Sequence, residues 1–213
     1  MNILIVNYEY PPLGGGGGVA TQQLANELSK RHVVHVLTSA YKDLPRDESH
    51  GNVYVHRASV WGRTALPTAS LSSMLTFVPS ALWRGIKLCR ANSFDVINAQ
   101  FVVPSGIPAM LLAKLFRKPF VLSFIGGDLY DPSKGTAPHR HWFLRMTIRF
   151  IARQAVARTA ISEDTKQRAL SLHGVQGEIA VVHLGLVPHT ARPTGRAVLG
   201  LPEIGRASCR ERV

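Results

Sequence analysis

Short apolar runs alternate with longer amphipathic stretches along most of the chain. The apolar runs have the length and composition of buried strands, and they cover residues 2–7, 33–38, 53–58, 95–100, 120–124, 158–161 and 179–183. Apolar residues at three- and four-residue spacing predict helices over residues 19–30, 70–91, 107–117, 141–155 and 163–173. Within this pattern, Pro79 can break the second helix, residues 41–51 are expected to form a loop, and Ser162 is expected to be the N-cap of the last helix.

This alternation predicts an α/β fold: a Rossmann-like, doubly wound parallel sheet with helices on both faces. Residues 1–187 are expected to form this domain. In such sheets, ligands bind at the carboxyl ends of the strands, where the strand order reverses. Residues 188–203 have the composition of a linker, and we interpret them as the link to a second domain and its start.

The last ten residues break with the rest of the sequence. Residues 204–213 contain three arginines and a cysteine and show no apolar periodicity. This string resembles a short sequencing adapter translated in frame, and a natural basic tail is the alternative. If residues 204–213 are such an adapter, the native sequence is cut where a second domain would begin.

Composition and charge narrow the class of protein. The 213 residues are 46% hydrophobic and 18% charged, which is typical of a folded, soluble domain. The first apolar run is too short for a signal peptide, and no stretch reaches the roughly 18 apolar residues of a membrane span. We therefore expect a cytoplasmic protein, with at most a peripheral contact at the inner membrane face. Two cysteines without ligand spacing predict neither a metal site nor a cofactor.

The net charge of +12 indicates an anionic partner. Nucleic acid, an acidic membrane and phosphorylated small molecules all satisfy this charge. The sequence has no basic motif interleaved with aromatic residues, so we expect no nucleic-acid partner.

Five consecutive glycines separate the first predicted strand from the first predicted helix, which is expected to begin near Val19. Glycines allow positive φ angles and a close approach of the backbone to a ligand, and the N-terminus of a helix favours an anion such as a diphosphate. The candidate phosphate-binding residues are Gly14, Gly15, Gly16 and Gly17. The spacing Gly15-x-Gly17-x-x-Ala20 fits a dinucleotide fingerprint, but the loop before it is too long for the required tight turn.

Several motifs occur together in a known order. They are Tyr-Pro-Pro-Leu-Gly-Gly-Gly at residues 10–16, Asp-Val-Ile-Asn-Ala-Gln at 95–100 with Pro-Ser-Gly at 104–106, Gly-Gly-Asp at 126–128, Ala-Ile-Ser-Glu-Asp-Thr at 160–165, and Val-Val-His-Leu-Gly at 181–185. In this order they resemble the N-terminal domain of GT-B glycosyltransferases of family 4, over roughly residues 1–187.

The resemblance implies transfer of a sugar from a nucleotide-diphosphate donor to a polysaccharide or a lipid-linked acceptor, usually with retention and without a required metal. It places the glycine loop at the donor phosphate and the rest of this domain on the acceptor side. Catalytic residues are then expected in the C-terminal domain, so this fragment alone should be inactive. A stand-alone module that binds a phosphorylated sugar or a nucleotide is the alternative.

The resemblance also assigns substrate-binding positions within this domain. They are Asn98, Gln100, Gly126, Gly127 and Asp128. The family often has histidines where this chain has Asn98, Gln100 and Ile125; amides can still bind hydroxyls, whereas isoleucine cannot. Asp128 is expected either to accept a hydroxyl or to cap a helix.

A stripe of basic residues follows the helix predicted over residues 141–155. The stripe is His141, Arg145, Arg149 and Arg153, and the other positions of this helix include Trp142, Phe143, Met146 and Phe150. The stripe can contact anionic lipid, or it can be a solvated face whose apolar side packs on the core. Arg140, at the head of this helix, is a candidate contact for an acceptor phosphate.

Overall fold

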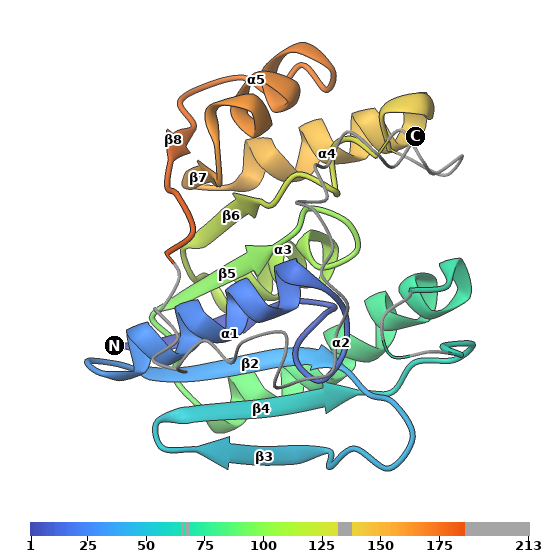
Figure 1. Ribbon diagram of the computed structural model, residues 1–213. Coiled ribbons are helices and arrows are strands. Elements are labelled where there is room, and N and C mark those ends of the chain that lie inside the picture. Colours follow the sequence, from blue (N-terminus) through green and yellow to red (C-terminus); the bar gives the residue numbers. More distant parts are fainter. Residues whose placement is uncertain (65, 67–68, 132–137, 186–213) are drawn as a thin grey trace, which may run out of the picture.

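Eight strands form one sheet in the computed structural model, which describes residues 1–64, 66, 69–131 and 138–185 (Figure 1). The strands are β1 (Asn2–Val6), β2 (Val33–Ser39), β3 (Asp47–His50), β4 (Val53–Ala58), β5 (Val96–Gln100), β6 (Phe120–Phe124), β7 (Ala157–Ala160) and β8 (Ala180–Val181). The helices are α1 (Gly16–Ser29), α2 (Leu71–Ala91), α3 (Gly106–Phe116), α4 (Trp142–Gln154) and α5 (Glu163–Ser171), with a 3₁₀ turn, η1 (Pro138–Arg140).

The strand order is β3-β4-β2-β1-β5-β6-β7-β8, and every pair except β3 with β4 is parallel. From β1 the chain first builds outwards through β2 and β4, and then returns to place β5 on the other side of β1. The strand order therefore reverses between β1 and β5. This topology confirms the predicted Rossmann-like, doubly wound α/β fold.

The two faces of the sheet carry separate cores, because successive side chains of a strand point to opposite faces. In β1, Ile3 and Ile5 pack with Ala25 of α1, whereas Leu4 and Val6 belong to the larger core that also contains residues of α2, α3, α4 and α5. Figure 1 shows α1 in front of the sheet and α2 and α3 behind it. The apolar side chains on each face of the sheet thus pack against a different set of helices.

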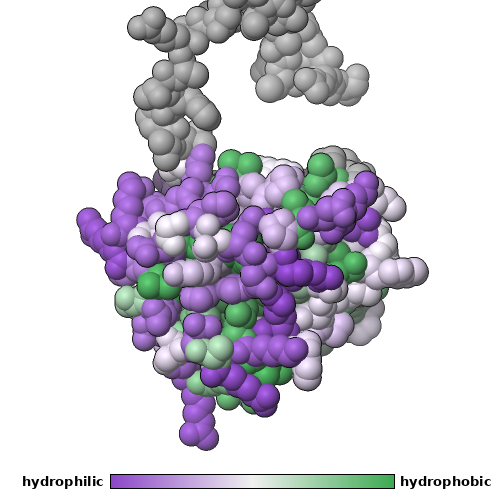
Figure 2. Space-filling view, turned by 90° about the horizontal axis from the view of Figure 1, so that it is seen from below, coloured by the Kyte–Doolittle hydropathy of each residue, from purple (hydrophilic) through white to green (hydrophobic). Residues whose placement is uncertain are grey.

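The prediction that residues 41–51 form only a loop is wrong, because β3 lies within them and pairs antiparallel with β4. The sequence of this strand is Asp-Glu-Ser-His, which contains no apolar residue that would predict a strand. The segment is extended because it pairs with β4 across the turn at Gly51. Polar side chains dominate the side of the molecule on which β3 lies (Figure 2). Charged residues on an edge strand discourage pairing with a second chain.

Three helix predictions can be compared with the structure in detail. Helix α1 begins at Gly16, not near Val19, so three of the glycines form its first turn. Pro79 does not break α2, since buried Phe77 and Ala81 hold the helix on either side of it. The N-cap prediction for Ser162 is confirmed: its side chain accepts a hydrogen bond from the N–H of Thr165 at 3.1 Å.

Among the described residues, no helix combines the length and the apolar character needed to cross a membrane. The linker predicted at residues 188–203 and the tail at 204–213 lie outside the part of the chain that the structure describes.

Candidate functional site

Three loops meet at the carboxyl edge of the sheet, around the point where the strand order reverses. They follow β1 (residues 7–15), β5 (residues 101–105) and β6 (residues 125–130). Because open α/β sheets bind ligands at this position, we call the three segments the carboxyl-edge loops and describe them as the candidate site.

The glycine loop follows β1 directly. Of its glycines, only Gly14 has a positive φ, +87°, and a Cβ there would lie 2.5 Å from a carboxylate oxygen of Glu9. The N–H of Gly15 donates to this same carboxylate at 3.2 Å, and Gly15 precedes the first residue of α1. Of the five glycines, only Gly14 therefore needs the positive φ angle that was predicted for this loop. The carboxylate of Glu9 lies beside the N-terminus of α1, and nothing in the sequence pattern indicated it.

The glycines differ in the space that surrounds them. A Cβ at Gly15 or Gly16 would meet nothing within 4 Å, whereas a Cβ at Gly17 would lie 2.2 Å from the Phe101 ring. The first N–H groups of an α-helix have no acceptor within the helix. The space beside Gly15 and Gly16 is thus open, although the Gly15 N–H donates to Glu9, while Gly17 has to be small because the Phe101 ring packs against it.

Asp128 ties the loop after β6 to the loop after β5. Its carboxylate accepts hydrogen bonds from the N–H groups of Val102 at 2.7 Å, Gly126 at 2.9 Å and Ile125 at 3.2 Å. Asp128 is only 4% exposed, and burial raises the pKa of this carboxyl group although the hydrogen bonds oppose the shift. Asp128 caps no helix here, and both of its oxygens are occupied by backbone donors.

A second link joins the loops after β1 and β5. The hydroxyl of Ser105 accepts a hydrogen bond from the N–H of Tyr8 at 2.9 Å, and Ser105 is fully buried. Together with Asp128 and the Phe101 contact, this bond makes the three carboxyl-edge loops one connected framework.

The predicted amides form a row on the α1 side of the sheet. Gln100 donates to the side-chain oxygen of Asn98 at 2.6 Å, and Asn98 donates to the hydroxyl of Ser123 at 3.1 Å. Thr159 of β7 donates to the same hydroxyl at 3.0 Å. The structure therefore brings Asn98 and Gln100 together, but it places them in a network of their own along β5, β6 and β7.

The remaining predicted positions are more exposed. Gly126 has φ +115°, and a Cβ at Gly127 would meet nothing within 4 Å. Arg140 ends η1 and is exposed.

A pocket with basic and aromatic walls lies at the carboxyl ends of β2 and β4. Its walls include Lys42, Arg46, Arg63, Tyr41 and Trp61. No signal along the sequence groups these residues, because they come from two separate loops that the pairing of β2 with β4 brings side by side.

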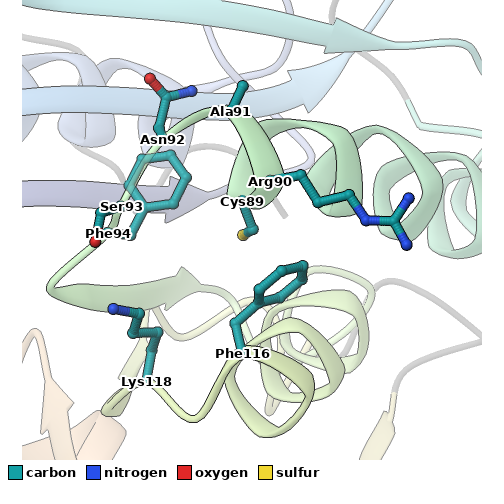
Figure 3. Close-up of a pocket in the computed structure, with 8 residues that line it drawn as sticks. All are labelled: Cys89, Arg90, Ala91, Asn92, Ser93, Phe94, Phe116 and Lys118. Carbon is teal, nitrogen blue, oxygen red and sulfur yellow. The ribbon is translucent and has the colours of Figure 1, made fainter.

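A different pocket opens at the opposite, amino edge of the sheet, between the ends of α2 and α3 (Figure 3). Cys89 points into it together with Phe116 and Lys118, and burial raises the pKa of the Cys89 thiol to about 11. A thiol that stays protonated at neutral pH is a poor nucleophile, so Cys89 acts as a packing residue. Within the described ranges, no three histidine, cysteine or acidic side chains are grouped closely enough to hold a metal ion.

Comparisons with known proteins identify the family and agree with the fold. Residues 15–185 match the model of a family described as a glycosyl transferase 4-like domain. No curated protein matches the chain in sequence.

Solved structures show the same fold. Sucrose-phosphate synthase from Thermosynechococcus elongatus is similar over 95% of this chain and 53% of its own, with a TM-score of 0.69 and 14% identity. A shorter segment of the same enzyme covers 87% of this chain and 90% of that segment, with a TM-score of 0.64 and 14% identity. Anabaena HepE, solved in complex with UDP, is similar over 87% of this chain and 44% of its own, with a TM-score of 0.56 and 16% identity. The chain thus spans about half the length of these complete proteins.

Proposed function

Because the chain belongs to the family of glycosyl transferase 4-like domains, we propose that it forms the acceptor-side half of a two-domain glycosyltransferase. In this proposal the complete enzyme transfers a sugar from a nucleotide-diphosphate donor to a polysaccharide or glycolipid acceptor, with retention of configuration. The second domain contributes the catalytic residues and most donor contacts, so this chain alone binds donor weakly and does not turn over. The supporting observation is the open helix N-terminus of α1 at the point where the strand order reverses.

The donor's diphosphate is proposed to bind at the start of α1. A Cβ at Gly15 or Gly16 would meet nothing within 4 Å, so there is space for a ligand, and the positive end of the helix dipole favours an anion. The UDP in the HepE structure is the precedent for the ligand class. The nearby carboxylate of Glu9 has to turn away from Gly15 when the diphosphate enters, because the two negative groups repel each other.

Titration of the chain with UDP, followed by backbone amide NMR, tests the donor proposal. We expect the signals of Gly15, Gly16 and Gly17 to shift with UDP and to stay in place with uridine, which lacks the phosphates. Gly16→Asp should weaken UDP binding about fivefold or more, since it places a negative charge at the helix N-terminus. Asn26→Asp adds the same charge to an exposed position later in α1 and should leave binding unchanged. Equal responses to UDP and uridine would contradict the proposal.

Asn98, Gln100, Gly126, Gly127 and Asp128 are proposed to shape the acceptor side, with Arg140 as a contact for an acceptor phosphate. Asp128 does so indirectly, by fixing the loops after β5 and β6.

Transfer and retention are tested on the chain joined to its second domain: a panel of nucleotide sugars identifies the donor, and NMR of the product's anomeric proton gives its configuration. Binding of UDP by the two-domain protein without transfer from any nucleotide sugar would contradict the proposed transferase activity.

Helix α4 is proposed to contact an anionic membrane. Its core-facing residues are Ile148, Ile151 and Ala152, whereas Trp142 is 72% exposed. The other apolar residues of the outer side are more than half exposed, and they are Phe143, Met146 and Phe150. The apolar side of α4 that packs on the core therefore consists of other residues than Trp142, Phe143, Met146 and Phe150. Large apolar side chains beside exposed Arg145 and Arg153 are typical of helices that lie in a membrane interface.

Co-sedimentation with vesicles tests this contact. Phosphatidylglycerol vesicles should bind the chain, and Trp142→Ser with Phe143→Ser should abolish binding, because both side chains would insert among the lipids. Arg145→Ser with Arg153→Ser should weaken binding to anionic vesicles; Arg149 is left in place because it donates to the carbonyl of His173 at 3.1 Å. Lys114→Ser with Arg117→Ser removes the same charge from the exposed end of α3 and serves as the control. Binding that survives the aromatic substitutions would overturn the proposal.

A further inference from the structure

The pocket at the carboxyl ends of β2 and β4 has the walls of an anion site. Its cavity measures about 190 Å³, which is smaller than the roughly 300–1,000 Å³ that enclose a whole drug-sized ligand. It therefore suits a single headgroup. None of the residues that the structure describes as lining this pocket is acidic, whereas Lys42, Arg46 and Arg63 are basic.

The basic side chains are held in place by their neighbours. Arg46 donates to the hydroxyl of Ser59 on the opposite wall, and Lys42 lies over the Tyr41 ring at 5.1 Å from its centre. Arg63 is buried, donates to the hydroxyl of Ser39 at 3.2 Å and lies over the Tyr8 ring. A positioned guanidinium and a nearby ammonium group are the donors that proteins use to bind phosphate.

One carbonyl group connects this pocket with the glycine loop. The carbonyl oxygen of Leu66 accepts hydrogen bonds from Arg63 at 2.9 Å and from the N–H of Gly14 at 3.0 Å. Gly14 directly precedes the proposed donor site at Gly15 and Gly16, so this carbonyl links the pocket to the loop that carries that site.

Exposed apolar side chains stand beside the pocket. Trp61 is 76% exposed on its wall, and Leu71 and Leu75, one turn apart at the start of α2, are 60% and 64% exposed. The N–H of Trp61 donates to the hydroxyl of Thr76 at 3.0 Å, which holds the Trp61 segment against α2. The pocket wall that carries Trp61 is thus in direct contact with the helix that carries Leu71 and Leu75.

We propose that this pocket binds the phosphate of an amphiphile, with its acyl chain lying on Trp61, Leu71 and Leu75, and that this amphiphile is the lipid-linked acceptor. The inference rests on the proposed function, and it makes a lipid phosphate the acceptor class. The basic walls match the charge of the phosphate, and the apolar side chains match the tail, whereas a free sugar phosphate would leave the apolar surface without a partner.

Binding of two probes to the chain tests the inference. The probes are inorganic phosphate and monomeric dihexanoyl phosphatidic acid, followed by Trp61 fluorescence in a chain with Trp83→Phe and Trp142→Phe. The phosphatidic acid should bind more than about tenfold more tightly than phosphate, because its short chains remove apolar surface from water. Lys42→Ala with Arg46→Ala should weaken both ligands about tenfold or more, since each loses charge-assisted hydrogen bonds.

Two further variants separate the parts of the pocket. Leu71→Ser with Leu75→Ser should weaken only the phosphatidic acid. Lys87→Ala with Arg90→Ala removes the same charge from exposed positions at the other end of α2 and should change neither affinity. Equal affinity for the two probes, or equal loss in both charge variants, would overturn the inference. UDP shifts at Gly15–Gly17 without phosphatidic acid binding refute this inference alone, whereas phosphatidic acid binding without UDP shifts refutes the donor proposal alone.

Discussion

The carboxylate of Asp128 accepts a hydrogen bond from the backbone N–H of Val102 at 2.7 Å, across two loops that follow neighbouring strands. The same carboxylate holds the N–H groups of Ile125 and Gly126. Buried backbone donors need acceptors, and here one side chain supplies them for both loops. Asp128 therefore determines the shape of the candidate site without having to touch a substrate.

Removing this carboxylate should destabilise the fold. Asp128→Ala leaves buried N–H groups without an acceptor, which costs roughly 1–3 kcal/mol for each unsatisfied group. We expect the free energy of unfolding in urea to fall by about 3 kcal/mol. Asp43→Ala, at an exposed loop position, should change it by less than about 0.5 kcal/mol. A similar loss of unfolding free energy in both variants would show that the hydrogen bonds to Asp128 have no special role.

Adjacent glycines in α1 should respond differently to alanine. In Gly17→Ala, the new Cβ would lie 2.2 Å from the Phe101 ring, so the helix or the ring has to move, at a cost of about 1–3 kcal/mol. In Gly16→Ala the Cβ meets nothing within 4 Å, and the better helix propensity should keep or slightly raise stability. Urea denaturation of the two variants measures the difference. Equal midpoints would contradict the packing of Phe101 on Gly17.

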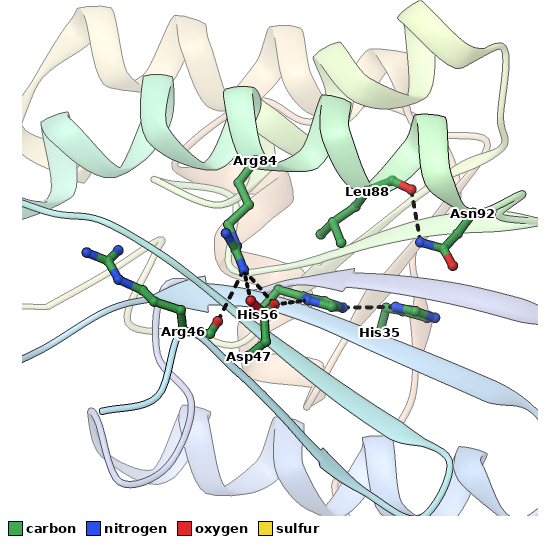
Figure 4. A network of polar contacts seen from close by, with 7 residues as sticks. All are labelled: His35, Arg46, Asp47, His56, Arg84, Leu88 and Asn92. Carbon is green, nitrogen blue, oxygen red and sulfur yellow. Dashed lines mark hydrogen bonds and ion pairs between the residues drawn. The ribbon is translucent and has the colours of Figure 1, made fainter. Parts of the chain in front are cut away.

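A buried histidine pair makes stability depend on pH (Figure 4). A hydrogen bond of 3.0 Å joins His35 Nδ1 to His56 Nε2, and His56 donates to Asp47, which also pairs with Arg84 of α2. Burial, followed by the charge of His56, lowers the pKa of His35 to about 4. The unfolded chain takes up a proton near the ordinary pKa of 6.5, whereas the folded chain does so only near pH 4.

The contribution of His35 to stability should therefore be complete above pH 6.5 and fall as the pH drops towards 4. The lowering of the His35 pKa from 6.5 to about 4 corresponds to roughly 3 kcal/mol over this range. His35→Phe keeps a ring between Tyr54 and Phe94 and should lose most of this pH dependence. His50→Gln, at an exposed position of β3, should retain it. Unfolding by urea at several pH values between 4 and 7.5 measures both, and an unchanged slope in His35→Phe would contradict the assignment.

The N-cap of α5 should contribute a modest amount to stability. The Ser162 hydroxyl accepts from the N–H of Thr165 at 3.1 Å, and Ser162→Ala leaves this donor without its partner. We expect a loss of about 1 kcal/mol. Ser162→Asp should retain most of the stability, because a carboxylate also caps a helix, and a loss as large as that of Ser162→Ala would argue against capping.

The sequence by itself determined the α-helices, seven of the eight described strands and the fold class. The spacing of apolar residues in strands and helices is a local property, so the runs of β1, β2 and β5 could be recognised without knowing their partners. The N-cap at Ser162 is local in the same way. The sequence also placed the glycines between β1 and α1, because this follows from the order of the elements, but it put the start of the helix near Val19 and not at Gly16. The polar strand β3 was missed, since only pairing with β4 gives it that conformation.

Only the tertiary structure decided which side chains face one another. Nothing along the chain links Asp128 to Val102, or Arg63 to Gly14, and nothing along α4 shows that Trp142 and Phe143 face outwards. These relationships depend on how the loops and helices pack on a common sheet, and contacts between distant segments leave no periodic signal. The fold could thus be predicted from local patterns. The hydrogen bonds of Asp128, the basic pocket at the ends of β2 and β4 and the exposed side of α4 arise from packing across the sheet.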